Sequence, residues 1–394
     1  MDLRKSIENQ TDWSLSIAHH VGSARSPPDS NLVLSPVSVH SVLAMVAAGS
    51  TGSTLDQSLK FLRSDGGEGE LRSLSSQLVQ IVLADGSASG GPKLAFAGSV
   101  WVDRSLSLKA EFEKVVREIF GAEARAVDFQ SKPAEATKEV NSWAETATNG
   151  LIKDVLPPGS VNSNARLILA NGLYFKGSWK DKFDPSVTSK SDFHRLDGSS
   201  IKHPFMTSRK KRFLRSHDGF KVLRMPYAQG RDQRQFSMYL FLPDARDGLR
   251  TLSERLASES GFLDRHCPTR EIEVGEFRVP KFKFSYAFEA SATLKELGLT
   301  LPFSAEAELT GMVESEAVGK GLTVSGVFHK AFVEVNEEGT EAAAASAAVV
   351  MLRALAAAPD DFVADHPFVF VIREDVTGVV VFYGHVVDPS VVSS

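Results

Sequence analysis

The chain has 394 residues, of which 42% are hydrophobic and 24% are charged. A chain of this length and composition can bury a large core, which argues against a disordered or fibrous protein. Its formal net charge is -5, from 44 basic and 49 acidic residues, and so weak a field argues against binding to nucleic acid or to an anionic membrane surface.

The residues from Leu3 to Val21 carry apolar side chains at helical spacing, which predicts an amphipathic helix rather than the continuous apolar core of a secretory signal. The sequence contains no apolar run long enough to span a membrane. Cys267 is the only cysteine, so no internal disulfide can form, and this fits a reducing compartment. We therefore expect a cytoplasmic protein, with extracellular release as an open alternative.

The first third of the chain is mainly helical by pattern. Apolar stripes predict helices over Pro36–Gly49 and Leu108–Phe120. Between them, the polar and glycine-rich stretch Glu68–Gly91 is expected to carry a loop or turn, and Leu94–Val102 alternates like a first strand. A long helix is predicted from Pro133 to about Thr148, before the stop Asn149-Gly150.

Strands dominate from Arg166 onward, with helices expected near Leu249–Ala257 and Phe288–Leu297. The end of the chain reads as a buried hairpin around the turn Thr377-Gly378. Helices first and strands later indicate an α+β fold. The predicted strands are Leu167–Phe175, Lys221–Pro226, Gln235–Leu242, Glu271–Phe288, Val327–Val335, Pro367–Ile372 and Val379–Val387.

Enzyme signatures are absent from the sequence: it has no phosphate-binding glycine loop, no dinucleotide fingerprint and no His-Glu-x-x-His zinc motif. His266-Cys267 places an imidazole beside a thiol, but adjacent residues rarely face each other, so an incidental surface thiol is the preferred interpretation. His19-His20 diverge by about 100° on a helix, so only one could face a metal ion. We expect neither a catalytic site nor a metal site.

The stretch from Glu337 to Pro359 has neither ordinary core nor ordinary surface composition. It is an alanine-rich connection between two predicted strands, and loops of this length are usually functional or disordered. Alanine favours a helix or a linker, which is one interpretation. As a strand, however, the segment would place only small uncharged side chains on one face, so that face could enter a packed sheet without burying a charge: Thr340, Ala342, Ala344, Ser346 and Ala348.

The same stretch resembles the hinge of inhibitory serpins, and similar motifs follow in order along nearly the whole chain. They include Leu34-Ser35-Pro36, Asn141-Ser142-Trp143, Asn171-Gly172-Leu173-Tyr174-Phe175, His203-Pro204-Phe205-Met206, Val279-Pro280-Lys281-Phe282 and Asp365-His366-Pro367-Phe368. The resemblance to this family, and to its intracellular plant-type members, implies one serpin domain over residues 1–394. That fold packs helices around three β-sheets and exposes a reactive-centre loop, here at about residues 337–360.

By the spacing that the resemblance implies, the bond cut by the target protease is Arg353-Ala354. An arginine at this position suits proteases with an acidic primary pocket, because guanidinium and carboxylate form a bidentate pair. The expected partners are arginine-preferring trypsin-like, papain-like or metacaspase-like proteases, held covalently by a monomeric inhibitor without a cofactor. The implied hinge comprises Glu337, Glu338, Gly339, Thr340, Glu341, Ala342, Ala343, Ala344 and Ala345.

The resemblance also implies a shutter beneath the central sheet, formed by Ser35, Ser38, Asn171 and His329, and a breach at Trp179 where loop insertion begins. Ordinary core packing and buried hydrogen bonds explain part of the same pattern. The rival function is a non-inhibitory serpin acting as a carrier, chaperone or storage protein. Bulky or charged residues on the inserting face would favour that rival, and none is present.

Overall fold

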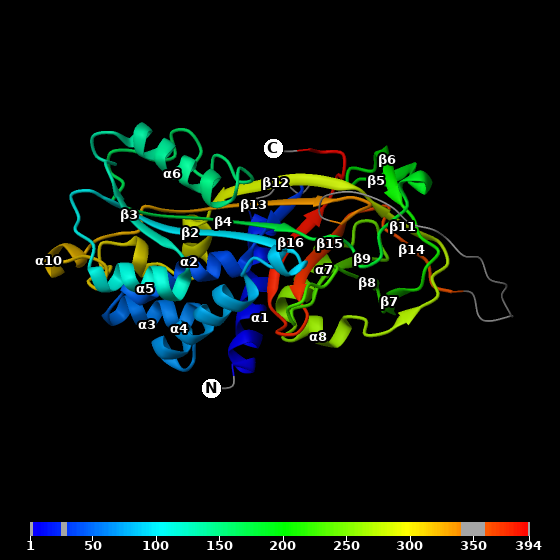
Figure 1. The fold of residues 1–394 in the computed structure, drawn as a ribbon, viewed down its shortest axis with the longest axis horizontal. Helices are drawn as coiled ribbons and strands as arrows, with labels where there is room; N and C mark the ends of the chain where they lie inside the picture. Colours follow the sequence, from blue (N-terminus) through cyan, green and yellow to red (C-terminus); the bar gives the residue numbers. More distant parts are fainter. Residues whose placement is uncertain (1–2, 25–29, 340–358, 393–394) are drawn as a thin grey trace.

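The computed structural model describes residues 3–24, 30–339 and 359–392. The strands of these residues form three sheets, and helices cover them (Figure 1). The helices are α1 (Arg4–Ala24), α2 (Pro36–Gly49), α3 (Gly52–Phe61), α4 (Gly67–Gln77), α5 (Ala110–Phe120), α6 (Pro133–Ala147), α7 (Leu249–Ser258), α8 (Phe262–His266), α9 (Ser291–Glu296) and α10 (Glu316–Gly319). Within the described residues, none of these helices combines the length and apolar character needed to cross a bilayer.

The central sheet has five strands and positions the site described below. Their order is β12 (Phe282–Glu289), β13 (Gly326–Val335), β4 (Leu167–Lys176), β2 (Lys93–Asp103) and β3 (Glu123–Val127). In Figure 1, α6 lies on one face of this sheet and α2 on the other. The alternation along β2 produces this layering, because Trp101 packs edge-to-face on Trp143 of α6 while Val100 and Val102 enter the core that contains α2.

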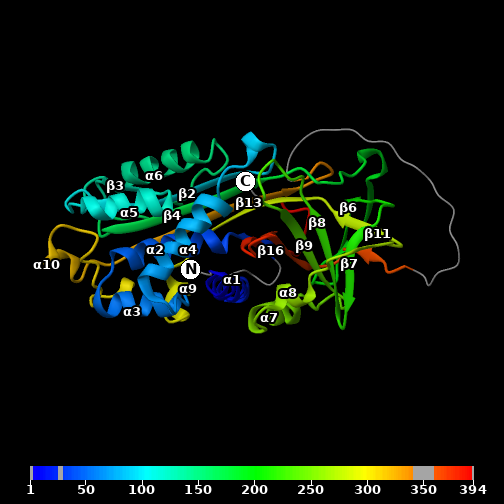
Figure 2. The same cartoon turned by 60° about the horizontal axis from the view of Figure 1, so that its bottom comes forward.

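The second sheet has seven strands and packs against the central sheet through an apolar cluster that includes Phe175, Phe282, Phe370 and Phe382. Its opposite face is covered by α1, α7 and α8 (Figure 2). The strand order is β1 (Leu32–Leu34), β16 (Val380–Val386), β15 (Phe368–Glu374), β9 (Phe236–Pro243), β8 (Phe220–Pro226), β7 (Arg212–His217) and β10 (Glu271–Ile272).

A third, four-stranded sheet lies at the end of the molecule away from α10 (Figure 1). Its strands are β14 (Phe362–Val363), β11 (Phe277–Pro280), β6 (Ser200–Met206) and β5 (Ser189–His194). β14 pairs parallel with β11. This pairing fixes the chain that follows residues 340–358 at this end of the molecule.

Most predicted elements are found with small differences at their ends. The turn expected within Glu68–Gly91 is present at residues 86–91, and α4 and a helical turn at Leu78–Val82 precede it, where Leu71, Leu74 and Leu78 form one buried stripe. Two expectations were wrong. Glu271–Phe288 is not one strand but β10, β11 and most of β12, which belong to three different sheets. The first strand is not Leu94–Val102, since β1 precedes it.

Candidate functional site

The two middle strands of the central sheet, β4 and β13, form a parallel pair that opens at one end. Their register runs from Ile168 opposite Gly326 to Tyr174 opposite Phe332. Beyond Phe332, β13 continues only against β12, ending with Val335 opposite Phe282. The seam between β4 and β13 is therefore closed along most of its length and open at its carboxyl end.

Trp179 and the residues that follow β13 fill this opening, the breach. The Trp179 backbone N–H donates to the Glu338 carbonyl oxygen at 2.8 Å, and its indole Nε1–H donates to the Asn336 carbonyl oxygen at 2.9 Å. The indole ring stacks on Tyr227, with centroids 4.5 Å apart. Trp179 is thus buried and bonded at the point where the chain leaves β13.

The chain turns at Gly339, which forms an isolated antiparallel bridge with Ser178. Its φ of +140° lies in a region that favours glycine. A Cβ atom at this position would come within 2.1 Å of the Gly177 carbonyl oxygen. Only glycine can therefore turn here so close to the chain that continues from β4.

Two ion pairs hold the carboxylates of Glu337 and Glu338, residues of the predicted hinge, at the breach. Glu337 pairs with Lys281 at 2.8 Å and also accepts a hydrogen bond from Thr188 Oγ1 at 2.9 Å. Glu338 pairs with Lys182 at 2.7 Å. Burial by itself would raise the pKa of Glu337, but the hydrogen bonds from Lys281 and Thr188 outweigh it and hold that pKa below its usual range.

The four residues expected to form a shutter do lie together, beneath the seam. Ser35 caps the N-terminus of α2, with Pro36 following, while Asn171 lies on β4 and His329 on β13, directly opposite each other. Ser38 Oγ donates to Asn171 Oδ1 at 2.9 Å, and Asn171 Nδ2 donates to the Phe328 carbonyl oxygen at 3.0 Å. This network connects the two strands of the seam with the start of α2.

His329 is fully buried, and its contacts define one tautomer. The Ser35 backbone N–H donates to His329 Nε2 at 3.0 Å, so Nε2 carries no proton, and Nδ1 lies 2.7 Å from Asn171 Oδ1, to which it donates. Burial lowers the pKa of His329 to about 3. The ring is therefore neutral at physiological pH. A second proton would have to bind to Nε2, where it would point at the hydrogen of the Ser35 N–H.

The segment after residue 358 is anchored beside the four-stranded sheet. The Gly275 N–H donates to the Asp360 carbonyl oxygen at 3.0 Å, and Ser216 Oγ donates to the Asp360 carboxylate at 2.8 Å. Lys221 Nζ donates to the Asp361 carbonyl oxygen at 2.9 Å. The chain is thus held on both sides of residues 340–358, by the breach before them and by these bonds after them.

Several predicted site residues lie outside the residues that the structure describes. They are the reactive bond Arg353-Ala354 and the hinge residues Thr340, Glu341, Ala342, Ala343, Ala344 and Ala345. Sequence reasoning in turn missed Thr188, Lys182 and Lys281 as partners of the hinge. Lys281 stands in the motif Val279-Pro280-Lys281-Phe282, but that motif gives no sign of the ion pair with Glu337.

The expectation that Cys267 is a surface thiol was wrong. The residue is 8% exposed, and burial raises its pKa to about 12, so the thiol is protonated and unreactive at neutral pH. The neighbouring His266 directs Nδ1 to the Phe262 carbonyl oxygen at 2.8 Å. This contact reflects helix packing within α8 rather than a catalytic pair.

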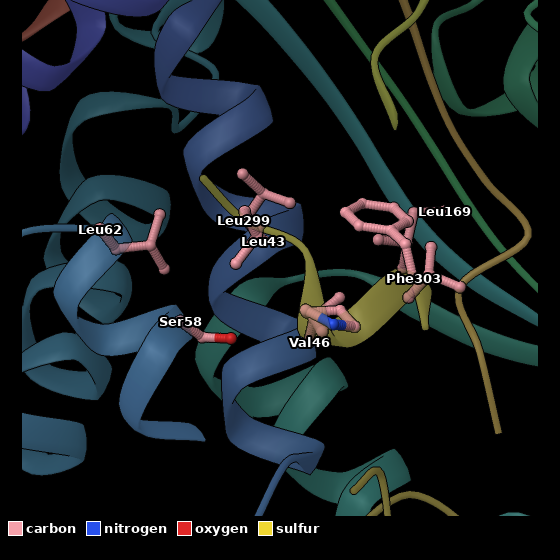
Figure 3. Close-up of a pocket in the computed structure, with 9 residues that line it drawn as sticks. Leu43, Val46, Ser58, Leu62, Leu169, Leu299 and Phe303 are labelled. Carbon is pink, nitrogen blue, oxygen red and sulfur yellow. The ribbon is translucent and has the colours of Figure 1, made fainter. Parts of the chain in front are cut away.

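An apolar gap lies on the same side of the central sheet as the shutter, between α2, α3 and β4 (Figure 3). Eight of its nine lining residues are apolar, and the exception, Ser58, donates its hydroxyl to the Thr54 carbonyl oxygen. The gap has no room for a water molecule. It is therefore a packing feature beneath the seam rather than a ligand site.

Comparison with known proteins gives concordant results. The family model described as Serpin (serine protease inhibitor) matches residues 8–389. Serpin-ZX of Arabidopsis thaliana is 55% identical, covering 99% of this chain and 100% of that protein, and Serpin-ZXA of Oryza sativa subsp. japonica is 55% identical, covering 98% of each. A solved structure of Arabidopsis AtSerpin1 in its native stressed conformation is 53% identical, with a TM-score of 0.92 over 99% of each chain.

Proposed function

The chain belongs to the serpin family, and we propose that it is an irreversible suicide-substrate inhibitor of arginine-specific serine or cysteine proteases. In this proposal residues 1–394 act as one domain, monomeric and cytoplasmic, with the reactive loop at about residues 337–360. In this proposal the protein offers a cleavable bond to the protease and is not itself an enzyme. The single cysteine, which can form no internal disulfide, supports a location in a reducing compartment such as the cytoplasm. Release of the protein from damaged cells is compatible with this location.

One observation carries the proposal: the chain leaves β13 at the open end of the seam and turns back there. Gly339 already forms an antiparallel bridge with Ser178, just beyond the end of β4. A strand that continued in this direction would run between β4 and β13 and antiparallel to both. The parallel pair would then be replaced by two antiparallel ladders, which are slightly more stable per residue.

The chemistry belongs to the target protease. Its serine or cysteine nucleophile attacks the Arg353 carbonyl carbon, the bond to the Ala354 nitrogen breaks, and the new amine leaves with a proton. Cleavage separates the hinge side of the loop from the anchored Asp360 and Asp361. The freed segment then inserts into the seam and carries the acyl-enzyme with it, before deacylation is complete. The native fold is in this sense kinetically trapped.

Mixing the protein with trypsin and separating the products on a denaturing gel tests this assignment. The expected result is a covalent complex larger than either protein. Clean cleavage after Arg353 with full recovery of trypsin activity would instead support the non-inhibitory carrier, chaperone or storage alternative.

The Thr340→Arg variant tests insertion separately from recognition. Because Thr340 is the first side chain on the inserting face, a charge there would have to be buried in the sheet. We expect the variant to be cleaved as a substrate, with the yield of complex falling about tenfold or more, since burial of an unpaired charge costs several kcal/mol. Glu341→Arg, on the opposite face, is the matched control and should keep its complex. Equal yields from both variants would contradict insertion.

A further inference from the structure

Positive charge is concentrated in one part of a chain that is acidic overall. Residues 176–224 contain 13 lysines and arginines but only 5 aspartates, whereas the whole chain has a net charge of -5. This stretch forms β5, β6, β7 and β8 and the turns between them. The elements with this excess of basic residues lie toward the end of the molecule that carries the four-stranded sheet (Figure 1), and acidic residues from other segments pair with some of them, as Glu338 does with Lys182.

The turn between β6 and β7, together with the first residue of β7, has the highest density of these charges: Arg209, Lys210, Lys211 and Arg212. We call these four residues the basic turn. The side chains of Lys210 and Lys211 are 56% and 59% exposed, and each has one acidic neighbour, Asp181 at 2.7 Å and Glu273 at 3.6 Å. Arg209 is exposed and has no ion-pair partner among the described residues. The acidic neighbours thus offset only part of the positive charge.

Arg212 gives the basic turn a rigid base. Its guanidinium lies over the rings of Phe183 and Phe277, 5.0 and 5.3 Å from their centroids, and the residue is only 6% exposed. Within the described part of the chain, its Nε and Nη2 atoms have no hydrogen-bond acceptor. A buried cation without a full set of acceptors adds to the positive potential of the turn.

The basic turn lies between the two anchored ends of the reactive segment. On the hinge side, Asp181 holds Lys210 and is adjacent to Lys182, which pairs with Glu338. On the other side, β7 follows the turn and contributes Ser216, which bonds Asp360. A protease that engages Arg353 must approach the region bounded by these two anchors.

We propose that the basic turn is an exosite that attracts and orients proteases whose surface around the active-site cleft is acidic. This inference rests on the inhibitory function proposed above. Complementary charge raises the rate of encounter rather than the strength of the final contact, and screening by salt reduces it. The exosite thus selects among proteases that share a preference for arginine, a choice that Arg353 alone cannot make.

The anionic and cationic forms of trypsin test the exosite, because both prefer arginine and differ in surface charge. With the wild-type protein, the rate constant for inhibition of anionic trypsin should fall steeply between about 20 mM and 300 mM salt, as the Debye length shortens. At low salt, neutralising the turn should slow this reaction about tenfold and leave the stoichiometry of inhibition unchanged. The test variant carries Arg209→Ala, Lys210→Ala and Lys211→Ala together.

A matched variant with the same change in net charge carries Lys114→Ala, Arg117→Ala and Lys138→Ala on α5 and α6, at the other end of the molecule (Figure 1). It should inhibit anionic trypsin at close to the wild-type rate. Inhibition of cationic trypsin should be insensitive to the basic turn, or faster without it. Far-UV circular dichroism and the thermal midpoint of both variants show whether each is folded.

The outcomes separate the two proposals. If neither trypsin gives a covalent complex with the wild-type protein, the inhibitory function fails and the exosite fails with it. If complexes form but the two triple variants behave alike, only the exosite is overturned. If instead heparin accelerates both trypsins and only the basic-turn variant loses that effect, the turn binds a polyanion and the direct protease contact is overturned.

Discussion

At the scale of single residues, His329 connects the protonation state of the shutter with the stability of the native fold. Its pKa is about 3 in the folded protein and about 6.5 in an unfolded chain, so below pH 6.5 the unfolded state binds a proton that the native state does not. Stability therefore falls as pH decreases from 6.5 toward 3. Between pH 7.5 and 5.0, we expect His329 to account for about 2 kcal/mol of that loss.

The His329→Gln variant isolates this contribution, because glutamine retains an acceptor for the Ser35 N–H and does not titrate. The buried His40 and His385, whose pKa values are lowered to about 4 and about 3, still contribute to the pH dependence of stability in this variant. Urea unfolding followed by tryptophan fluorescence at the two pH values should show a weaker pH dependence in the variant. An unchanged dependence would mean that His329 is not the proton acceptor.

Glu337 allows a second residue-scale prediction, at the breach. The substitution Glu337→Gln keeps the shape of the side chain and removes the charge that pairs with Lys281. Because the carboxylate is largely buried, we expect urea unfolding to show a loss of about 1 to 2 kcal/mol. The control Glu316→Gln removes the partner of Lys320 in an exposed pair and should leave the midpoint unchanged. Equal midpoints for the two variants would contradict the structural role of the Glu337 pair.

At the scale of elements, the seam between β4 and β13 should accept a strand from outside the chain. A synthetic peptide with the sequence of residues 340–351 would supply small side chains to the inner face and two sets of backbone hydrogen bonds. At 100 times its Kd, such a peptide adds about 2.7 kcal/mol of stability, which corresponds to roughly 3 °C in the thermal midpoint of a chain of this length. The occupied protein should be cleaved by trypsin without forming a complex.

The control peptide has arginine in place of Thr340 and Ala344, so the same strand would bring two charges into the sheet. It should neither raise the midpoint nor abolish inhibition. A shift of equal size with both peptides would indicate binding elsewhere on the surface.

Local pattern predicted the elements of this seam better than it predicted their assembly. The ends of α2 follow from Pro36 and the apolar stripe that ends at Gly49, and β4 from a continuous apolar run. Glu271–Phe288, by contrast, has strand character throughout, yet its backbone hydrogen bonds go to three sheets. Strand propensity is local, whereas the partner of a strand depends on residues far away in the sequence.

The contacts of the candidate site could not be predicted from local sequence pattern either. Ser38, Asn171 and His329 are more than 100 residues apart, so no spacing rule could bring them together, and only the resemblance to a known family suggested that they meet. The ion pairs of Glu337 and Glu338 had no signal in the sequence, because lysines are common on surfaces and pairing depends on the final geometry.

At the scale of the whole molecule, cutting the proposed reactive loop should make this protein more stable, whereas a nick in an ordinary loop leaves stability unchanged or lowers it. The native chain keeps β4 and β13 paired in parallel and holds both ends of residues 340–358. The intact segment therefore cannot enter the sheet as an additional antiparallel strand.

A single cut at Arg353-Ala354 removes that constraint. Protein nicked by a protease that then dissociates should therefore melt at least about 5 °C above the intact chain, the shift that several kcal/mol of new strand pairing would produce in a chain of this length. Scanning calorimetry of intact and nicked protein measures this directly, with the nicked Thr340→Arg variant as the control that should gain little. A nicked wild-type chain that melts at or below the intact protein would show that cleavage releases no stored stability, and the chain would then be a substrate with the fold of an inhibitor.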